Sequence, residues 1–362
     1  MYFTENDKHT IDNCRFCFMC RHVCPVGMVT GSEANNARAR AELLSLVNRG
    51  FSYTPDIAEV VYECVLCGAC TTQCCTGFDP LPFTKHARME ALTQGIAPAY
   101  VNDLLDKIES EGTAYAPASD PELMAELTGL PEKADVLLFL GNAASVCPES
   151  AVAAVRLLKK AGVSFAVMKE EPDCGMDLAD LMGPAEEARQ ALLAAAEKIN
   201  AVGAKTIVAL SPDSAKVFLR EYREWGAALS AEVKTFPAFL VELWKSGALS
   251  FQKTGEAVTY QDPFRLAREL HETEAPRQLI AACAELRDMY RHGEEAISCG
   301  EGTIGLYRPD LAEKMAARRM LEAVSTGASC IITACPTSCT ALRSAGGLPV
   351  KPLEVFLLEH TC

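Results

Sequence analysis

The stretch CRFCFMCRHVCP, residues 14–25, is matched by a second stretch, CVLCGACTTQC, at residues 64–74. Both contain four cysteines with the spacing Cys-x2-Cys-x2-Cys-x3-Cys. Three thiolates two residues apart on a curled loop can reach three corners of one four-iron cubane, and the fourth, after a longer gap, points towards a second cubane. The paired runs therefore predict two 4Fe–4S clusters in one ferredoxin-like domain.

The same spacing exchanges the fourth ligands between the two runs. Cluster 1 is predicted to be held by Cys14, Cys17, Cys20 and Cys74. Cluster 2 is predicted to be held by Cys64, Cys67, Cys70 and Cys24. Cys75 competes with Cys74 as a ligand, although the x3 gap favours Cys74. Structural zinc is the alternative, but zinc sites usually use two separated Cys-x2-Cys pairs, which these runs fit poorly.

Charged residues near the runs are candidates for modifying the clusters. Arg15, Arg21 and Arg38 could offset the clusters' negative charge, and His22 could tune a nearby potential. A solvated charged face is the simpler interpretation of all four. Gly68 is expected to allow close approach of the backbone to cluster 2.

Length and composition limit the remaining classes. The 362 residues suggest two or three domains, and 49% hydrophobic with 23% charged residues is an ordinary globular composition. A net charge of −14 argues against nucleic acid as a partner. The polar start MYFTENDKHTIDNC resembles no secretory signal, and the apolar run at 136–140 is too short for a transmembrane segment. We expect a cytoplasmic chain, peripheral at a membrane only through a partner, with its 17 cysteines reduced or ligated.

Helical patterns dominate residues 1–100. Apolar residues recur on one face across 33–48, and a third helix is expected over 83–93. Between them, Thr54 as N-cap and Pro55 at the first helical position begin a helix that leads into Cys64. These signals predict a mainly helical dicluster domain over residues 1–100 and a helical spacer over 101–134.

From residue 135 onwards, strands and helices alternate. Strands are expected at 136–140, 163–168 and 206–210, with helices at 148–161 and 184–202 between them. Landmarks then recur at offsets of 122 to 125 residues: Asn142 with Phe264, Asp173-Cys174-Gly175 with Ser298-Cys299-Gly300, and Ser211-Pro212 with Cys335-Pro336. The expected fold class is therefore α+β multidomain, with two tandem α/β repeats at 135–250 and 251–362 after the dicluster domain.

Three segments of the second repeat carry a family resemblance. They are DPFRL at 262–266, SCG at 298–300 and TACP at 333–336. Together with the two cysteine runs, they make nearly the whole chain resemble the heterodisulfide reductase D-like iron–sulfur family. Its relatives include the iron–sulfur subunits of glycolate oxidase, anaerobic glycerol-3-phosphate dehydrogenase and lactate-utilisation systems.

The resemblance implies a further cluster site in each repeat, built from one cysteine, a Cys-Cys-Gly and a Cys-Pro-x-Cys. In the first repeat these positions are mostly replaced, by Asn142, Asp173, Ser211 and Ser214, and only Cys174 remains. The second repeat keeps three thiols, at Cys299, Cys335 and Cys339. A third cluster there needs a fourth ligand from Cys283, His271 or a partner. We instead expect relic thiols packed in a core, and packing or surface roles for Cys147, Cys174, Cys330 and Cys362.

No glycine-rich dinucleotide fingerprint follows a predicted strand, so we expect flavin or NAD on another chain. The favoured function is a non-autonomous electron-transfer subunit of an oxidoreductase. By the resemblance, it relays electrons between a partner flavoprotein dehydrogenase, acting on a small hydroxy acid or polyol, and a downstream carrier protein or quinone system. The alternative is a catalytic heterodisulfide-reductase-like subunit that uses a third cluster in the second repeat.

Overall fold

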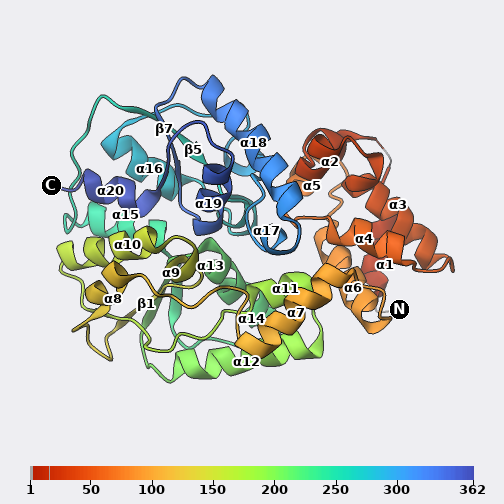
Figure 1. Ribbon diagram of the computed structural model, residues 1–362, viewed down its shortest axis with the longest axis horizontal. Helices are drawn as coiled ribbons and strands as arrows, with labels where there is room; N and C mark the ends of the chain where they lie inside the picture. The colour runs from red at the N-terminus through yellow and green to blue at the C-terminus, as the bar shows by residue number, and fades with distance from the viewer. Residues whose placement is uncertain (1–2, 16) are drawn as a thin grey trace.

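Short helices surround the two cysteine runs in the N-terminal domain. The computed structural model describes residues 3–15 and 17–362. The helices of this domain are α1 (Glu5–Asp12), α2 (Pro25–Thr30), α3 (Ala37–Asn48), α4 (Pro55–Tyr62), α5 (Ala69–Thr72) and α6 (Leu81–Thr93), with 3-10 turns η1 (Met19–His22) and η2 (Glu33–Asn35). Figure 1 shows this domain at one end of the molecule, beside the two repeats.

Capping residues set the helix boundaries near the cysteine runs. The Thr54 side chain accepts a hydrogen bond from the Ile57 amide and Pro55 occupies the first turn of α4, which confirms the expected start. The helix expected over 33–48 begins later, at Ala37. Asn36 is extended and caps the Ala39 amide, so residues 33–35 form a separate 3-10 turn.

Two helices form the spacer between the dicluster domain and the repeats. They are α7 (Ala99–Glu111) and α8 (Pro121–Leu127). The Asp120 side chain caps the amide of Leu123 at the start of α8, and Leu123 is fully buried in the core of the repeats. The spacer therefore packs against the repeats.

Two four-stranded parallel sheets form the body of the molecule. The first has the order β2-β1-β3-β4, from β1 (Val136–Phe139), β2 (Phe165–Ala166), β3 (Thr206–Ala209) and β4 (Glu232–Thr235). The second has the order β6-β5-β7-β8, from β5 (Ala257–Gln261), β6 (Glu285–Leu286), β7 (Cys330–Thr333) and β8 (Val350–Pro352). The identical strand orders support the tandem duplication, with 135–250 and 251–362 as its proposed limits.

The helices of the two repeats also correspond. The first repeat has α9 (Ala143–Val146), α10 (Pro148–Lys160), α11 (Met176–Met182), α12 (Glu186–Asn200), α13 (Pro212–Leu219), α14 (Glu221–Glu224) and α15 (Phe236–Lys245). The second has the π-helical turn η3 (Arg265–Glu269), α16 (Glu274–Cys283), η4 (Gly293–Glu295), α17 (Ile304–Tyr307), α18 (Pro309–Ser325), α19 (Pro336–Ser344) and α20 (Leu353–Glu359). Helices α13 and α19 each follow a central strand and begin with proline.

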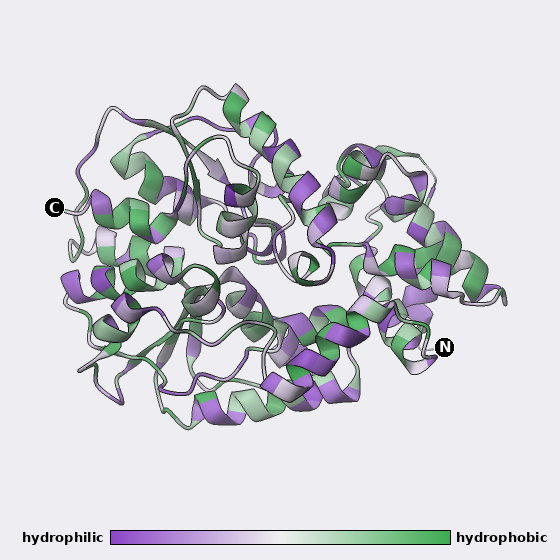
Figure 2. Ribbon diagram, viewed as in Figure 1, coloured by the Kyte–Doolittle hydropathy of each residue, from purple (hydrophilic) through white to green (hydrophobic). Residues whose placement is uncertain are grey.

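One apolar core joins the two repeats. Helices α10, α15, α16 and α20 lie between the two sheets, and their buried side chains belong to one cluster with strand residues from both repeats (Figure 1). A second cluster fills the dicluster domain and includes Leu181, Phe264 and Tyr307 from the repeats. Figure 2 shows the resulting pattern on α12 and α18, where apolar and polar residues alternate along the helix. Among the described residues, no helix is long and apolar enough to cross a bilayer.

Candidate iron–sulfur sites

The cysteines assigned to cluster 1 lie around one cavity, which we call cavity 1. Its lining includes Cys14, Cys17, Cys20 and Cys74, together with Arg38 and Phe78. Three of the four thiols come from the first run, and Cys74 comes from the second. The η1 turn and α5, which carry parts of the two runs, pack against each other and bring the runs together.

The cysteines assigned to cluster 2 lie around an adjoining cavity, cavity 2. Its lining includes Cys24, Cys64, Cys67 and Cys70, and also Arg40. Cys70 lines both cavities. The structure thus groups the eight thiols in the exchanged sets of the ferredoxin spacing, and their ligation of iron stays a prediction.

Left-handed backbone at one matched position shapes both cysteine loops. Phe18 follows Cys17 with φ 67°, and Gly68 follows Cys67 with φ 71°. A Cβ on Gly68 would meet its nearest neighbour, a Leu81 methyl group, at an ordinary 3.8 Å. Gly68 is therefore explained by its conformation rather than by a crowded approach to the cluster.

Cys74 and Cys75 differ in their surroundings. Cys74 lines cavity 1 and its sulfur lies 3.2 Å from the Thr76 hydroxyl, whereas Cys75 is exposed and does not line either cavity. Within 3–15 and 17–362, no group of three or more His, Cys, Asp or Glu side chains could hold a single metal ion. The cysteine sulfurs around a cubane lie farther apart than the ligands of a single metal ion. The sets of cysteines that line each cavity are therefore the appropriate test of the predicted ligand sets.

The two cavities differ in their access to solvent. At cavity 1, Cys17 is exposed, and Phe18 and Met19 keep 45% and 46% of their surface in solvent. At cavity 2, Cys24 and Cys67 are buried. Burial raises the pKa of the Cys67 thiol to about 11, although the nearby Arg268 opposes that rise. Cys64 and Cys70 are half-buried, so cavity 2 lies deeper than cavity 1 without being fully enclosed.

Three buried arginines that the sequence did not single out surround cavity 2. Arg40 lines it, Arg88 donates to the Cys64 carbonyl, and Arg268 of the second repeat donates from Nε to the Cys67 carbonyl at 2.5 Å. The Nη2 atoms of Arg40 and Arg268 are buried without a hydrogen-bond partner among the described residues. Orphaned cationic donors beside four thiols fit an anionic iron–sulfur cluster, whose sulfurs accept hydrogen bonds.

Of the charged residues expected to modify the clusters, Arg15 and Arg38 line cavity 1. Arg15 is exposed and donates to backbone carbonyls of Asp12 and Asn13, and Arg21 pairs with Glu33. His22 is exposed. Arg38 lines cavity 1 and lies over the ring of Phe18 at 4.2 Å. Helical periodicity could have separated Arg40 from Arg38, because Arg40 shares the buried face of α3 with Ala37, Ala41 and Leu44.

The three thiols of the second repeat lie together at the carboxyl ends of β5 and β7. Cys335 occupies the N-cap position of α19, and its carbonyl accepts a hydrogen bond from the Cys339 amide. The Cys299 sulfur lies 4.0 Å from the Ser338 carbonyl. All three are buried. Burial, with Asp213 of the first repeat as the next cause, raises the pKa of Cys335 to about 12. Cys335 is thus a buried thiol that holds its proton at neutral pH.

The fourth-ligand candidates named from the sequence are not near these thiols. Cys283 belongs to the core between the two sheets, and His271 is exposed beside Glu294. Cys147 of the first repeat instead packs in one apolar cluster with Cys299 and Cys339. Cys147 was expected to have only a packing or surface role, but it lies directly beside the thiols of the second repeat.

The equivalent position in the first repeat is polar. Asn142 donates to Asp213 at 3.1 Å, and Asp173 accepts from Thr113 at 2.9 Å. Ser211 caps α13 through the Asp213 amide. Asn142, Asp173 and Asp213 border a cavity of about 690 Å³ at the carboxyl end of the first sheet. Oxygen-rich side chains are poor ligands for an iron–sulfur cluster, so the residues present do not fit one here.

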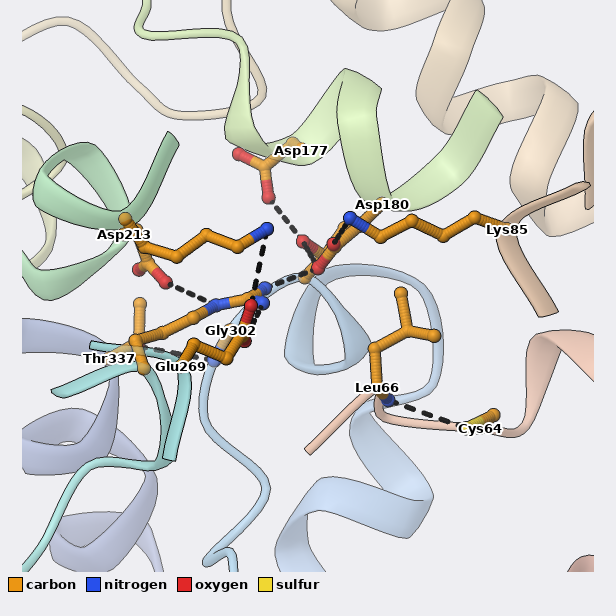
Figure 3. Close-up of polar contacts among 12 residues, drawn as sticks. Cys64, Leu66, Lys85, Asp177, Asp180, Asp213, Glu269, Gly302 and Thr337 are labelled. Atoms are coloured by element: carbon orange, nitrogen blue, oxygen red, sulfur yellow. Dashed lines mark hydrogen bonds and ion pairs between the residues drawn. The ribbon is translucent and has the colours of Figure 1, made fainter. Parts of the chain in front are cut away.

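A buried ion-pair network joins the repeats to the dicluster domain. Arg265 of η3 contacts Asp180 at 2.5 Å, Asp213 at 3.3 Å and Glu269 at 2.6 Å. Lys85 of α6 reaches in beside Asp180 (Figure 3) and contacts Glu221 at 2.8 Å. Burial opposes ionisation of Asp180, but Arg265 and Lys85 hold its pKa below its ordinary value. No sequence pattern signals this network, because its members are far apart along the chain.

Comparisons with known proteins agree with this arrangement. Residues 10–78 match the family model of the 4Fe-4S dicluster domain, and residues 258–343 match that of the cysteine-rich domain. The chain is 26% identical over 365 residues to the D-subunit of the dihydromethanophenazine:CoB–CoM heterodisulfide reductase of Methanosarcina mazei, across 90% of this chain and 87% of that protein.

Other relatives are similar over smaller shares. A probable membrane-anchored ferredoxin of Chromohalobacter salexigens is 27% identical across 94% of this chain and 57% of its own length. A probable glycolate oxidase iron–sulfur subunit of Bacillus subtilis is 30% identical across 51% and 43%. The crystal structure of a hypothetical protein from Helicobacter pylori shares the fold, with a TM-score of 0.60 at 11% identity, across 99% of this chain and 73% of that one.

The dicluster domain, the cysteine-rich domain and these relatives agree with the resemblance found in the sequence. The chain therefore carries a 4Fe–4S dicluster domain at residues 10–78 and a cysteine-rich domain at residues 258–343, and over 90% of its length it is similar to the D-subunit of heterodisulfide reductase.

Proposed function

We propose that this chain is the electron-transfer subunit of an oxidoreductase complex. The observation that carries the proposal is the pair of adjoining cysteine-lined cavities that share Cys70. One cavity lies near the surface and the other against the repeats. A bound 4Fe–4S cluster supplies one-electron transfer, which suits the division of a flavin's two-electron chemistry into single steps.

The residues of this chain provide ligation, burial and a docking face. Exposed Phe18 and Met19 sit beside exposed Cys17 at cavity 1. Apolar side chains at the rim of a redox site suit a partner that docks briefly and closely. Cavity 1 is accordingly the proposed contact with the electron-donating partner.

The proposed donor is a flavoprotein dehydrogenase that oxidises a small hydroxy acid or polyol. Support comes from the glycolate oxidase relative, whose name describes an iron–sulfur subunit. The proposed acceptor is a carrier protein or quinone system. If a flavoprotein co-purifies with the chain, addition of its substrate should bleach the cluster absorbance, with about one electron taken up per cluster. A co-purifying flavoprotein whose substrate leaves the clusters oxidised contradicts the assignment.

The alternative is catalysis at the second repeat. The buried group of Cys299, Cys335 and Cys339 favours it, because three thiols already lie together. Cys147 of the first repeat packs beside Cys299 and Cys339 and is the fourth thiol that such a cluster would need. Disulfide reduction by the isolated chain with reduced viologen, abolished by Cys335→Ser, would support this alternative over the relay.

Iron content is the direct test of the cofactor set. The anaerobically purified chain should contain about eight iron atoms and eight acid-labile sulfides, four of each per cluster. The matched control replaces Cys299, Cys335 and Cys339 together with serine and should retain the same iron content. A content of about two zinc ions would contradict the ferredoxin sites, whereas about twelve iron atoms, reduced in the control, would establish a third cluster.

A further inference from the structure

The side chain of Arg268 crosses from the second repeat to the loop that carries Cys67. Its Nε donates to the Cys67 carbonyl at 2.5 Å, and its Nη1 donates to the carbonyls of Ala296 at 2.5 Å and Glu294 at 3.1 Å. The residue is 8% exposed. None of these acceptors is charged, so no carboxylate among them offsets the positive charge beside the loop.

Arg40 places a second positive charge at cavity 2. It is 2% exposed, lines cavity 2 and donates from Nε to the Val60 carbonyl at 2.9 Å. Its Nη2, like that of Arg268, has no partner among the described residues. Two buried guanidinium groups without a carboxylate partner thus flank the four thiols of cavity 2.

The surroundings of cavity 1 differ in this respect. Arg15 lines cavity 1 but is exposed, and the exposed Arg21 pairs with Glu33 at 2.8 Å. Arg38 pairs with Glu42 at 3.8 Å. Water and carboxylates weaken the field of these charges, whereas the field of a buried cation is screened much less.

We propose that the positive charges of Arg40 and Arg268 hold the reduction potential of cluster 2 above that of cluster 1. The second repeat, which supplies Arg268, thereby favours electron flow from cluster 1 to cluster 2. The proposal rests on the proposed function and adds a direction to it. Reduction adds one negative charge to a cluster, and a fixed positive charge nearby favours that state. Burial alone lowers the reduction potential, because the interior solvates the more negative reduced state poorly. Arg40 and Arg268, together with Arg88 at the Cys64 carbonyl, are the buried charges that oppose this effect. One electron passes from the reduced cluster 1 to the oxidised cluster 2, with no bond made and no proton moved.

Arg268 is a positioning residue, since it acts on the cluster through charge and through the Cys67 carbonyl. It also lies against the turn at Gly68, where its Cδ and Nε would be 3.9 Å from an added Cβ. The loop that carries a predicted ligand of cluster 2 is therefore fixed directly by the second repeat. The cysteine-rich repeats acquire a role here that does not need a cluster of their own.

The test is a redox titration of the loaded full-length chain, followed by electron paramagnetic resonance. The variants are Arg268→Gln and Arg40→Gln, and the control is Arg49→Gln, which removes an exposed arginine at the end of α3 that pairs with Asp12. Each Gln variant should decrease the reduced-to-oxidised ratio of cluster 2 about tenfold at a fixed potential, a shift of about 59 mV for one electron. The control and cluster 1 should not shift.

The wild-type chain provides a measurement that does not depend on the folding of any variant. A soluble dysprosium chelate should broaden the signal of the exposed cluster 1 and spare that of the buried cluster 2. As the potential is lowered, the signal that appears first should be the one that the chelate does not broaden, which is the signal of cluster 2. If the broadened signal appears first, or if the Gln variants with full iron content keep the wild-type potential, the proposal is wrong. A wild-type chain that contains no iron after anaerobic purification would instead contradict the proposed function.

Discussion

At the scale of single residues, the two cysteine loops solve one conformational problem with different side chains. Phe18 and Gly68 both follow the second cysteine of their run and both have φ near 70° with ψ near 0°. The left-handed conformation costs a non-glycine residue roughly 1–2 kcal/mol. Phe18 tolerates that conformation with its ring against the guanidinium of Arg38. The first loop is thus the more strained of the two.

Gly68→Ala tests this interpretation. The substitution should destabilise the domain by roughly 1–2 kcal/mol through backbone strain, while the ordinary contacts of the new Cβ, at 3.8 Å or more, leave iron content unchanged. Thermal unfolding under anaerobic conditions measures the change. The control is Gly255→Ala, where the backbone is not left-handed and no atom lies within 4 Å of the new Cβ, so its effect should be close to zero or slightly stabilising. A loss of iron in Gly68→Ala would show that close approach to the cluster matters after all.

At the scale of elements, the packing of η1 against α5 brings the two cysteine runs together, so that each run can supply one predicted ligand to the other run's cluster. Each element is too short to be stable alone. Cys20 of η1 borders cavity 1, and Cys70 of α5 borders both cavities. Metal binding and folding are coupled where a site does not exist in the unfolded chain. The two cysteine runs should therefore order together.

Cys74→Ser is the matching experiment. Cys74 is part of the second run, yet its loss should remove cluster 1, whose other ligands belong to the first run. Iron content should fall from about eight towards four atoms, with the cluster 2 signal retained but weakened. Cys75→Ser is the control and should keep all the iron, because Cys75 is exposed and borders neither cavity. Full iron in Cys74→Ser together with a loss in Cys75→Ser would reassign the ligand.

At the scale of the whole molecule, buried charges join three parts of the chain. Lys85 comes from the dicluster domain, Asp180 from the first repeat and Arg265 from the second. Asp177 lies beside this network and accepts a hydrogen bond from Thr303 at 2.7 Å. Burial, with Asp173 as the next cause, raises the pKa of Asp177 to about 8. Asp177 is therefore uncharged in the folded protein at neutral pH.

This protonation makes stability depend on pH in a defined direction. The carboxyl of an unfolded Asp titrates near 3.8, so between pH 4 and 8 the folded state holds a proton that the unfolded state has lost. Stability from this group must therefore fall as pH rises through that window. Asp177→Asn, which can still accept from Thr303, should gain stability over wild type as pH rises from 5 to 8, with little further gain above pH 8.

Anaerobic thermal unfolding at pH 5, 6.5 and 8 measures that gain. Asp310→Asn is the control, because Arg308 lowers the pKa of Asp310 below its ordinary range and the group stays ionised throughout the window. Its effect on stability should be constant with pH. A constant effect for Asp177→Asn as well would show that Asp177 is ionised in the folded protein.

Much of the local structure was predictable from the sequence because its causes are local. The cysteine spacing identified the dicluster domain, Thr54 and Pro55 placed the start of α4, and the runs near 136 and 206 placed two central strands. The helix expected over 33–48 was wrong at its start, because the Asn36 cap competes with the apolar periodicity that continues upstream of it. The offset between landmarks predicted two repeats, and the matching sheet orders support this.

What only the tertiary structure decided is the electrostatic setting of the sites. Arg268 lies 201 residues from Cys67 and Arg88 lies 219 residues from Tyr307, and no local pattern relates such partners. Cys147 likewise meets Cys339 only because the two repeats pack face to face. The sequence determined which groups can bind iron, since that depends on thiols at short spacing. Which charges surround them depends on long-range packing of three domains, and only the folded chain defines that.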